Sequence, residues 1–127
     1  MRLLLDTQTF LWFVSDGPRL SRYSRALLED DNELLLSIAT LWEMAIKVSL
    51  GKLGAALPYE VFVTQQLTLN SIQILSIQVA HLAVVSTLAF HHRDPFDRLL
   101  IAQSMVEHLP IVSSDSTFDA YPVQRLW

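Results

Sequence analysis

The sequence contains no cysteine, which excludes disulfide bonds and thiolate metal sites. Any metal ion bound by this chain must therefore be held by oxygen or imidazole ligands, and hard divalent cations are the leading candidates. Basic residues are also few, since 9 Lys and Arg stand against 13 Asp and Glu and give a formal net charge of −4. This balance argues against a protein that coats nucleic acid, but it does not exclude a nuclease, whose metal-binding acids add negative charge.

Long apolar runs are absent as well. The apolar start of the chain meets Asp6 before it can form the core of a signal peptide, and no run approaches the length needed to cross a membrane. We therefore expect a cytoplasmic protein that does not contact membranes. The 127 residues are 51% hydrophobic, which predicts a single domain over residues 1–127 with one core and some apolar surface left for a partner.

Short apolar runs alternate with segments of helical spacing along the chain. Runs this apolar are typical of parallel strands that are buried on both faces, so we expect an α/β fold with helices on both sides of a short parallel sheet. The predicted strands are residues 2–5, 34–37, 71–75, a run that begins at 111, and 123–127, and the predicted helices are residues 7–14, 22–30, 37–52, 58–70, 78–89 and 95–107. Strand 71–75 alternates in polarity, which places it nearer the sheet edge.

The last predicted helix begins with an acid at the edge of its apolar face. Asp94 is placed to cap the helix, and Pro95 suits the first helical position. Asp97 falls at the third helical position, where it can reach back to the N–H of Asp94 in a capping box. Alternatively, Asp97 binds a cation. Leu100 and Ile101 share its face of the helix, and an unpaired carboxylate is unfavourable beside apolar side chains.

Three other acids stand where they can meet Asp97. Asp6 and Asp115 each follow a predicted strand, and the carboxyl ends of parallel strands share one edge of a sheet. Glu43 lies inside a helix that begins at the same edge. Each has a structural alternative: Asp6 can cap the next helix, and Glu43 can pair with Lys47 four residues later. If all four acids converge, Mg²⁺ or Mn²⁺ would offset their mutual repulsion.

Such a site would support attack of metal-activated water on a phosphodiester without a protein nucleophile. Hydroxyl groups near the predicted sheet edge can orient the acids or donate hydrogen bonds to a phosphate, namely those of Thr7, Ser113 and Ser114. Three basic residues are candidate phosphate contacts, although each can equally be a solvated charge: Lys47, Arg93 and Arg98. The pair His91–His92 suits an exposed loop and can also contact RNA.

These motifs, in this order, make the chain resemble the PIN-domain nucleases and, within them, the VapC-type toxins of bacterial type II toxin–antitoxin pairs. The resemblance covers essentially the full chain and rests on four pieces: Leu3–Thr7, Ser37–Lys47, Arg93–Gln103 and Ile111–Asp115. The stretch Arg93–Arg98 is the most specific of them. The resemblance implies a three-layer α/β/α sandwich with a short central parallel sheet and an endoribonuclease activity that depends on Mg²⁺ or Mn²⁺.

By position, the resemblance implies catalytic and metal-binding roles for Asp6, Glu43, Asp97 and Asp115. Supporting roles remain open for Asp94, as a cap or a partner of the metal ligands, and for Asp119, because the last acid of the family varies in placement. The resemblance also implies an RNA substrate, a cognate antitoxin whose C-terminal segment lies over the site, and a homodimer formed through helices.

Two other classes of protein share some of these sequence features. A catalytically inert PIN-like module would keep the fold, use its acids as helix caps and act through protein contacts. A receiver-type signalling domain also gathers acids and Mg²⁺ at strand ends, but it carries adjacent acids after its first strand, whereas Asp6 is followed by Thr7.

Overall fold

The computed structural model describes residues 1–54 and 56–127. Within these residues, parallel strands form one sheet in the order β3–β2–β1–β4–β5. The strands are β1 (Arg2–Leu5), β2 (Glu33–Ser37), β3 (Ile72–Leu75), β4 (Ile111–Val112) and β5 (Arg125–Leu126). The predicted parallel sheet is therefore confirmed, and the strand expected near the edge, β3, is an edge strand. The first strand of the chain, β1, lies at its centre.

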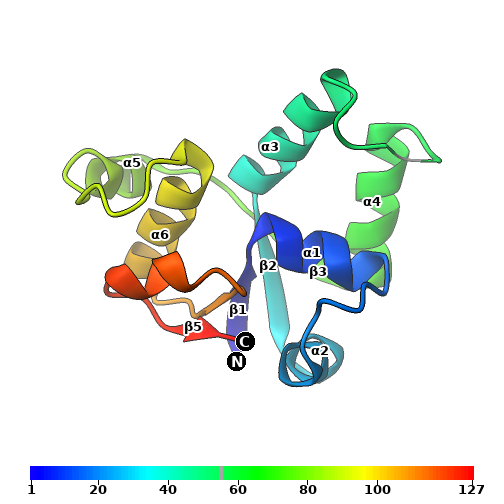
Figure 1. Cartoon of the computed structure of the whole chain (residues 1–127), viewed down its shortest axis with the longest axis horizontal. Coiled ribbons are helices and arrows are strands. Elements are labelled where there is room, and N and C mark those ends of the chain that lie inside the picture. The colour runs from blue at the N-terminus through cyan, green and yellow to red at the C-terminus, as the bar shows by residue number, and fades with distance from the viewer. Residues whose placement is uncertain (55) are drawn as a thin grey trace.

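Helices cover both faces of this sheet (Figure 1). One face carries α1 (Thr7–Val14), α2 (Arg22–Glu29), α3 (Ile38–Ser49) and α4 (Tyr59–Leu69), and the other carries α6 (Pro95–Glu107), on which α5 (Val79–Val85) packs, and the 3₁₀ helix η1 (Ser116–Ala120). This arrangement is the predicted three-layer α/β/α sandwich. In the described part of the chain, no helix combines the length and apolarity needed to cross a bilayer.

The leucine run of β1 supplies both halves of the core. Leu3 and Leu5 pack with Phe10 of α1 on one face, whereas Leu4 packs with Leu100 of α6 on the other. Successive side chains of a strand point to opposite faces, so an uninterrupted apolar run buries every residue when helices cover both sides. The three β1 leucines have no exposed surface. The carboxyl end of β1 is thereby fixed in the middle of the molecule.

One helix is shorter than its sequence pattern predicts. The apolar spacing predicts a helix over residues 78–89, but α5 ends at Val85. Residues 86–94 instead form a loop that leads to the start of α6. The buried guanidinium of Arg98 in α6 stabilises this loop by donating hydrogen bonds to the carbonyl oxygens of Leu88 at 3.0 Å and Ala89 at 2.9 Å.

Candidate active site

The centre of the candidate site is Asp6, which directly follows the central strand. Its Oδ1 accepts a hydrogen bond from the backbone N–H of Thr9 at 2.9 Å and caps α1. Its Oδ2 accepts a hydrogen bond from the Ser113 hydroxyl at 2.5 Å, which comes from the end of β4. The residue is only 7% exposed. The helix cap that was open as an alternative therefore forms, and the same carboxylate also joins two strand ends.

Glu43 reaches the same edge of the sheet from α3. Its Oε1 accepts a hydrogen bond from the hydroxyl of Thr7 at 2.6 Å, and Thr7 follows Asp6 directly. Its Oε2 lies 3.2 Å from the Nζ of Lys47, so the expected pair four residues apart is also present. The Glu43 side chain is 14% exposed. The carboxylate is therefore held from both sides and lies close to the end of β1.

The start of α6 differs from the expected capping box. Asp94 caps the helix as predicted, since its Oδ1 accepts from the N–H groups of Phe96 at 2.8 Å and Asp97 at 3.3 Å. Its own N–H, however, donates to Nδ1 of His92 at 3.1 Å. Asp97 does not reach back to that N–H, and its Oδ2 instead lies 3.0 Å from Nε2 of His92. The capping box that was open as an alternative for Asp97 therefore does not form, because His92 accepts the hydrogen bond from the Asp94 N–H.

Asp115 completes the cluster from the loop after β4. Its Oδ1 accepts hydrogen bonds from the Thr117 N–H at 3.0 Å and hydroxyl at 2.7 Å, which begin η1. Its Oδ2 lies 3.7 Å from Nε2 of His92. One potential ligand atom each from His92, Asp97 and Asp115 lies within 4.8 Å of the others. His92 was not predicted to belong to this site, and the signal for it was its position two residues before the helix-capping Asp94.

The acids influence one another's charge. Burial and the charges of the Asp94, Asp6 and Glu43 carboxylates together raise the pKa of Asp97 to about 7, although His92 opposes this rise. Burial also raises the pKa of Asp6, against the hydrogen bonds that lower it, and the charge of Asp115 adds to the rise. The four predicted acids, Asp6, Glu43, Asp97 and Asp115, therefore share one electrostatic environment.

Asp115 titrates in the opposite direction. Burial raises the pKa of Asp115, but the hydrogen bonds from Thr117 and the interaction with His92 outweigh it and bring this pKa below its usual value. Within the described residues, the four carboxylates outnumber the one ammonium group paired with them, that of Lys47, so the cluster carries an excess of negative charge. Oxygen ligands of this kind fit Mg²⁺ or Mn²⁺, which would remove the repulsion.

Several residues predicted near the site have other roles. The exposed Asp119 forms a two-pronged pair with Arg125 of β5, with both N–O distances at 2.9 Å, and this guanidinium holds the pKa of the carboxyl below its usual value. Asp119 thus ties η1 to the edge strand. Ser114 is exposed, whereas Ser113 bonds Asp6. Arg93 is exposed, so it alone of the predicted basic residues presents an open charge.

The prediction that Arg98 contacts phosphate was wrong. Its side chain points into the protein, and the residue is 5% exposed. The guanidinium donates to the carbonyl oxygens of four residues: Val85, Leu88, Ala89 and His92. It also lies 4.0 Å from the ring centroid of Phe90. Arg98 therefore shapes the loop before α6 and is not available to RNA.

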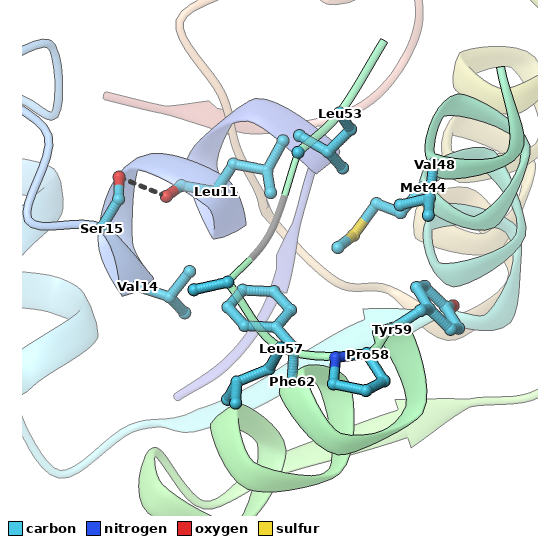
Figure 2. A pocket seen from close by; sticks show the side chains of 12 residues that line it. Leu11, Val14, Ser15, Met44, Val48, Leu53, Leu57, Pro58, Tyr59 and Phe62 are labelled. Atoms are coloured by element: carbon cyan, nitrogen blue, oxygen red, sulfur yellow. Dashed lines mark hydrogen bonds between the residues drawn. The ribbon is translucent and has the colours of Figure 1, made fainter. Parts of the chain in front are cut away.

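An apolar cavity of about 500 Å³ lies between α1, α3 and α4, apart from the acids (Figure 2). Its walls are Leu11 and Val14 from α1, Met44 and Val48 from α3, and Phe62 from α4. The rest of the lining consists of Ser15, Tyr59 of α4 and residues of the loop between α3 and α4: Leu53, Gly54, Ala56, Leu57 and Pro58. The helices that form it, α1 and α3, are those that carry Thr7 and Glu43.

The PIN domain family matches the sequence over residues 3–124, and the chain belongs to that family. Among solved structures, the chain is similar to one in VapBC2 from Rickettsia felis bound to a promoter DNA fragment (16% identity, TM-score 0.74, 99% of this chain and 98% of that chain).

It is also similar to a chain of VapBC-1 from nontypeable Haemophilus influenzae (15% identity, TM-score 0.70, 99% and 97% of the two chains). A third similar chain is that of FitAcB from Neisseria gonorrhoeae (20% identity, TM-score 0.68, 100% and 97%). At such identities the likeness concerns the fold. None of the curated protein sequences matches the chain.

Proposed function

We propose that this PIN-domain protein is a Mg²⁺- or Mn²⁺-dependent endoribonuclease and the toxin of a type II toxin–antitoxin pair. The observation that carries the proposal is the gathering of four carboxylates from separate elements at the carboxyl edge of a parallel sheet, where burial raises the pKa of Asp6 and Asp97. Membership of the PIN family and the fold shared with VapBC and FitAcB chains support it.

In this proposal Asp6, Glu43, Asp97 and Asp115 hold the cation. A divalent ion bound there supplies activation of water and stabilisation of charge on the phosphate. The chain's own groups set the geometry: Ser113 orients Asp6, Thr7 orients Glu43, and Thr117 orients Asp115. Each of these contacts fixes one carboxylate oxygen and leaves the other for a ligand or a second contact. Arg93 is exposed and lies between His92 and Asp94 in the sequence, so it is the candidate phosphate contact.

RNA cleavage by purified protein tests the proposal. We expect cleavage to require added Mg²⁺ or Mn²⁺, and we expect Asp97→Asn to reduce its rate by about a hundredfold or more, as losses of charge stabilisation at a reacting centre do. The matched control is Asp119→Asn, which removes an exposed acid outside the cluster. Wild-type protein without metal-stimulated cleavage would favour the alternative, a catalytically inert interaction module.

The proposed antitoxin would occupy the apolar cavity between α1, α3 and α4. Apolar walls of this extent are suited to a partner's side chains. The cavity shares helices α1 and α3 with the acids, so a segment seated there can continue over the site. We expect Leu57→Asp, at the half-open rim, to weaken co-purification with the product of the adjacent gene. Val61→Asp, exposed on α4 outside the cavity, should not, and equal loss in both variants would refute this placement.

A further inference from the structure

His92 lies among the acids, and the proposed set of metal ligands does not include it. Its Nε2 is 3.0 Å from Oδ2 of Asp97 and 3.7 Å from Oδ2 of Asp115, and its side chain is 16% exposed. A histidine beside two carboxylates can bind the cation itself, or it can hold the carboxylates by hydrogen bonds. The two roles require the ring proton on different nitrogens, because a nitrogen that binds a metal carries no proton.

The other ring nitrogen decides between these roles. The backbone N–H of Asp94 donates to Nδ1 of His92 at 3.1 Å, and a nitrogen that accepts a hydrogen bond carries no proton. The proton of the neutral ring is therefore on Nε2, where it faces Asp97 and Asp115. Histidines that bind metals show the reverse arrangement, in which the second nitrogen donates to a carbonyl or a carboxylate.

We propose that His92 is a positioning residue and not a metal ligand: its Nε2–H donates to the carboxylate of Asp97 and orients it, next to Asp115, toward a shared cation. This inference rests on the proposed metal-dependent function. In this role Nε2 of His92 forms a hydrogen bond within the protein and does not bind the cation. The remaining ligands of the cation are then all oxygen atoms. Such a set is the one that Mg²⁺ prefers.

The backbone of His92 is anchored so that the ring keeps this orientation. Its N–H donates to the Tyr121 hydroxyl at 2.8 Å, and that hydroxyl donates to the Ala89 carbonyl at 2.7 Å. Its carbonyl accepts from Nη1 of Arg98 at 3.2 Å. Tyr121 and the buried Arg98 thus hold both peptide groups of His92. Because α5 ends at Val85, His92 lies in a loop, and its imidazole faces the acids.

The orientation of the Asp97 carboxylate depends on His92 more than that of the Asp115 carboxylate does. Oδ1 of Asp115 is independently held by Thr117 at the start of η1. In residues 1–54 and 56–127, by contrast, His92 is the only side chain within hydrogen-bonding distance of the Asp97 carboxylate. Loss of the imidazole therefore releases Asp97 first, and metal binding by the intact cluster should weaken.

The test is Mn²⁺ binding by the full chain, measured from the electron paramagnetic resonance signal of free Mn²⁺. We expect His92→Ala to raise the dissociation constant by about 10- to 100-fold, the usual effect of removing a hydrogen-bonding partner of a ligand. His92→Gln places an amide N–H near the position of Nε2 and should recover most of the affinity. His108→Asn, a change of an exposed histidine at the other end of α6, is the control and should bind as the wild type does.

Pulsed electron paramagnetic resonance of the bound Mn²⁺ separates the two roles directly. Hyperfine coupling to a coordinated imidazole nitrogen should be absent from the wild type. Such a coupling, lost in His92→Ala, would overturn the inference while leaving the proposed function intact, and so would wild-type affinity in His92→Ala. A wild type that binds no Mn²⁺ would overturn the proposed function and this inference with it.

Discussion

At the scale of single residues, Asp97 shows how the cluster affects stability. Its pKa of about 7, raised from 3.8 mainly by burial, means that at intermediate pH the folded metal-free protein keeps a proton that the unfolded chain has released. The folded state then binds more protons than the unfolded state, so its stability falls as pH rises through this range. The metal-free protein therefore becomes less stable toward neutral pH because of its own candidate site.

This sign leads to a prediction for thermal unfolding in the presence of EDTA. At about pH 8 we expect the free energy of unfolding of Asp97→Asn to exceed that of the wild type by about 1–2 kcal/mol. This figure is reduced for solvent screening of the partly exposed carboxylate. The difference should shrink as pH falls and vanish below the ordinary aspartate pKa of 3.8, where the wild-type carboxyl is protonated in both states. Differential scanning calorimetry across this range measures it. A wild type as stable as Asp97→Asn at pH 8 would contradict the raised pKa.

At the scale of elements, the loop of residues 86–94 depends on Arg98. Its guanidinium lies in α6 and satisfies carbonyls that α5 leaves free. A buried arginine that donates to several carbonyls connects two elements. Its removal leaves those carbonyl oxygens without a hydrogen-bond donor. The loop also carries His92, so the order of the loop and the geometry of the acids are linked.

We expect Arg98→Met to destabilise the protein by about 3 kcal/mol, because charged hydrogen bonds are lost and buried carbonyls are left unpaired. Urea unfolding followed by circular dichroism measures the effect. Arg93→Met is the matched control, since Arg93 is an exposed arginine at the start of the same motif, and its replacement should change stability by less than about 0.5 kcal/mol. Similar losses in both variants would refute the role given to Arg98.

The sequence patterns predict the elements and the meeting of the acids better than they predict individual contacts. Strand ends and helix starts are local features, so the positions of Asp6 and Asp94 could be read from neighbouring residues. The burial of Arg98 could not, because most of the carbonyls that accept its hydrogen bonds lie in the loop after α5, whose path the sequence pattern did not predict. The pairing of Asp119 with Arg125 likewise depends on where β5 lies in the sheet.

At the scale of the whole molecule, α3 presents an apolar surface beside the site. Large apolar side chains recur every four residues along α3 and its C-cap: Ile38, Trp42, Ile46 and Leu50 are 39%, 59%, 36% and 62% exposed. The ring of Trp42 packs edge-on against Phe96 of α6, with centroids 5.2 Å apart. A stripe of this kind is the surface that we propose for the homodimer, because its burial against a second copy would remove apolar area from water.

Light scattering after gel filtration tests this surface. We expect the wild type to have the mass of a dimer and Ile46→Glu to have that of a monomer, because the substitution places a charge in the middle of the stripe. Leu69→Ser is the control, since Leu69 is 71% exposed at the far end of α4 and its loss should leave the mass unchanged. A monomeric wild type, or an Ile46→Glu variant that remains dimeric, would rule out this interface.

The central place of β1 also governs when the acid cluster can exist. Asp6 takes its hydrogen bond from Ser113, which lies 107 positions later, and Thr9 bonds Val112 across a similar separation. Closing so long a stretch of chain is entropically unfavourable until the intervening elements have formed, and topologies of this kind fold slowly. During synthesis the ribosome therefore releases β1 long before its partner β4. A nascent chain that has not yet reached Ser113 has no assembled cluster, so any activity of the site begins only once β4 has been made.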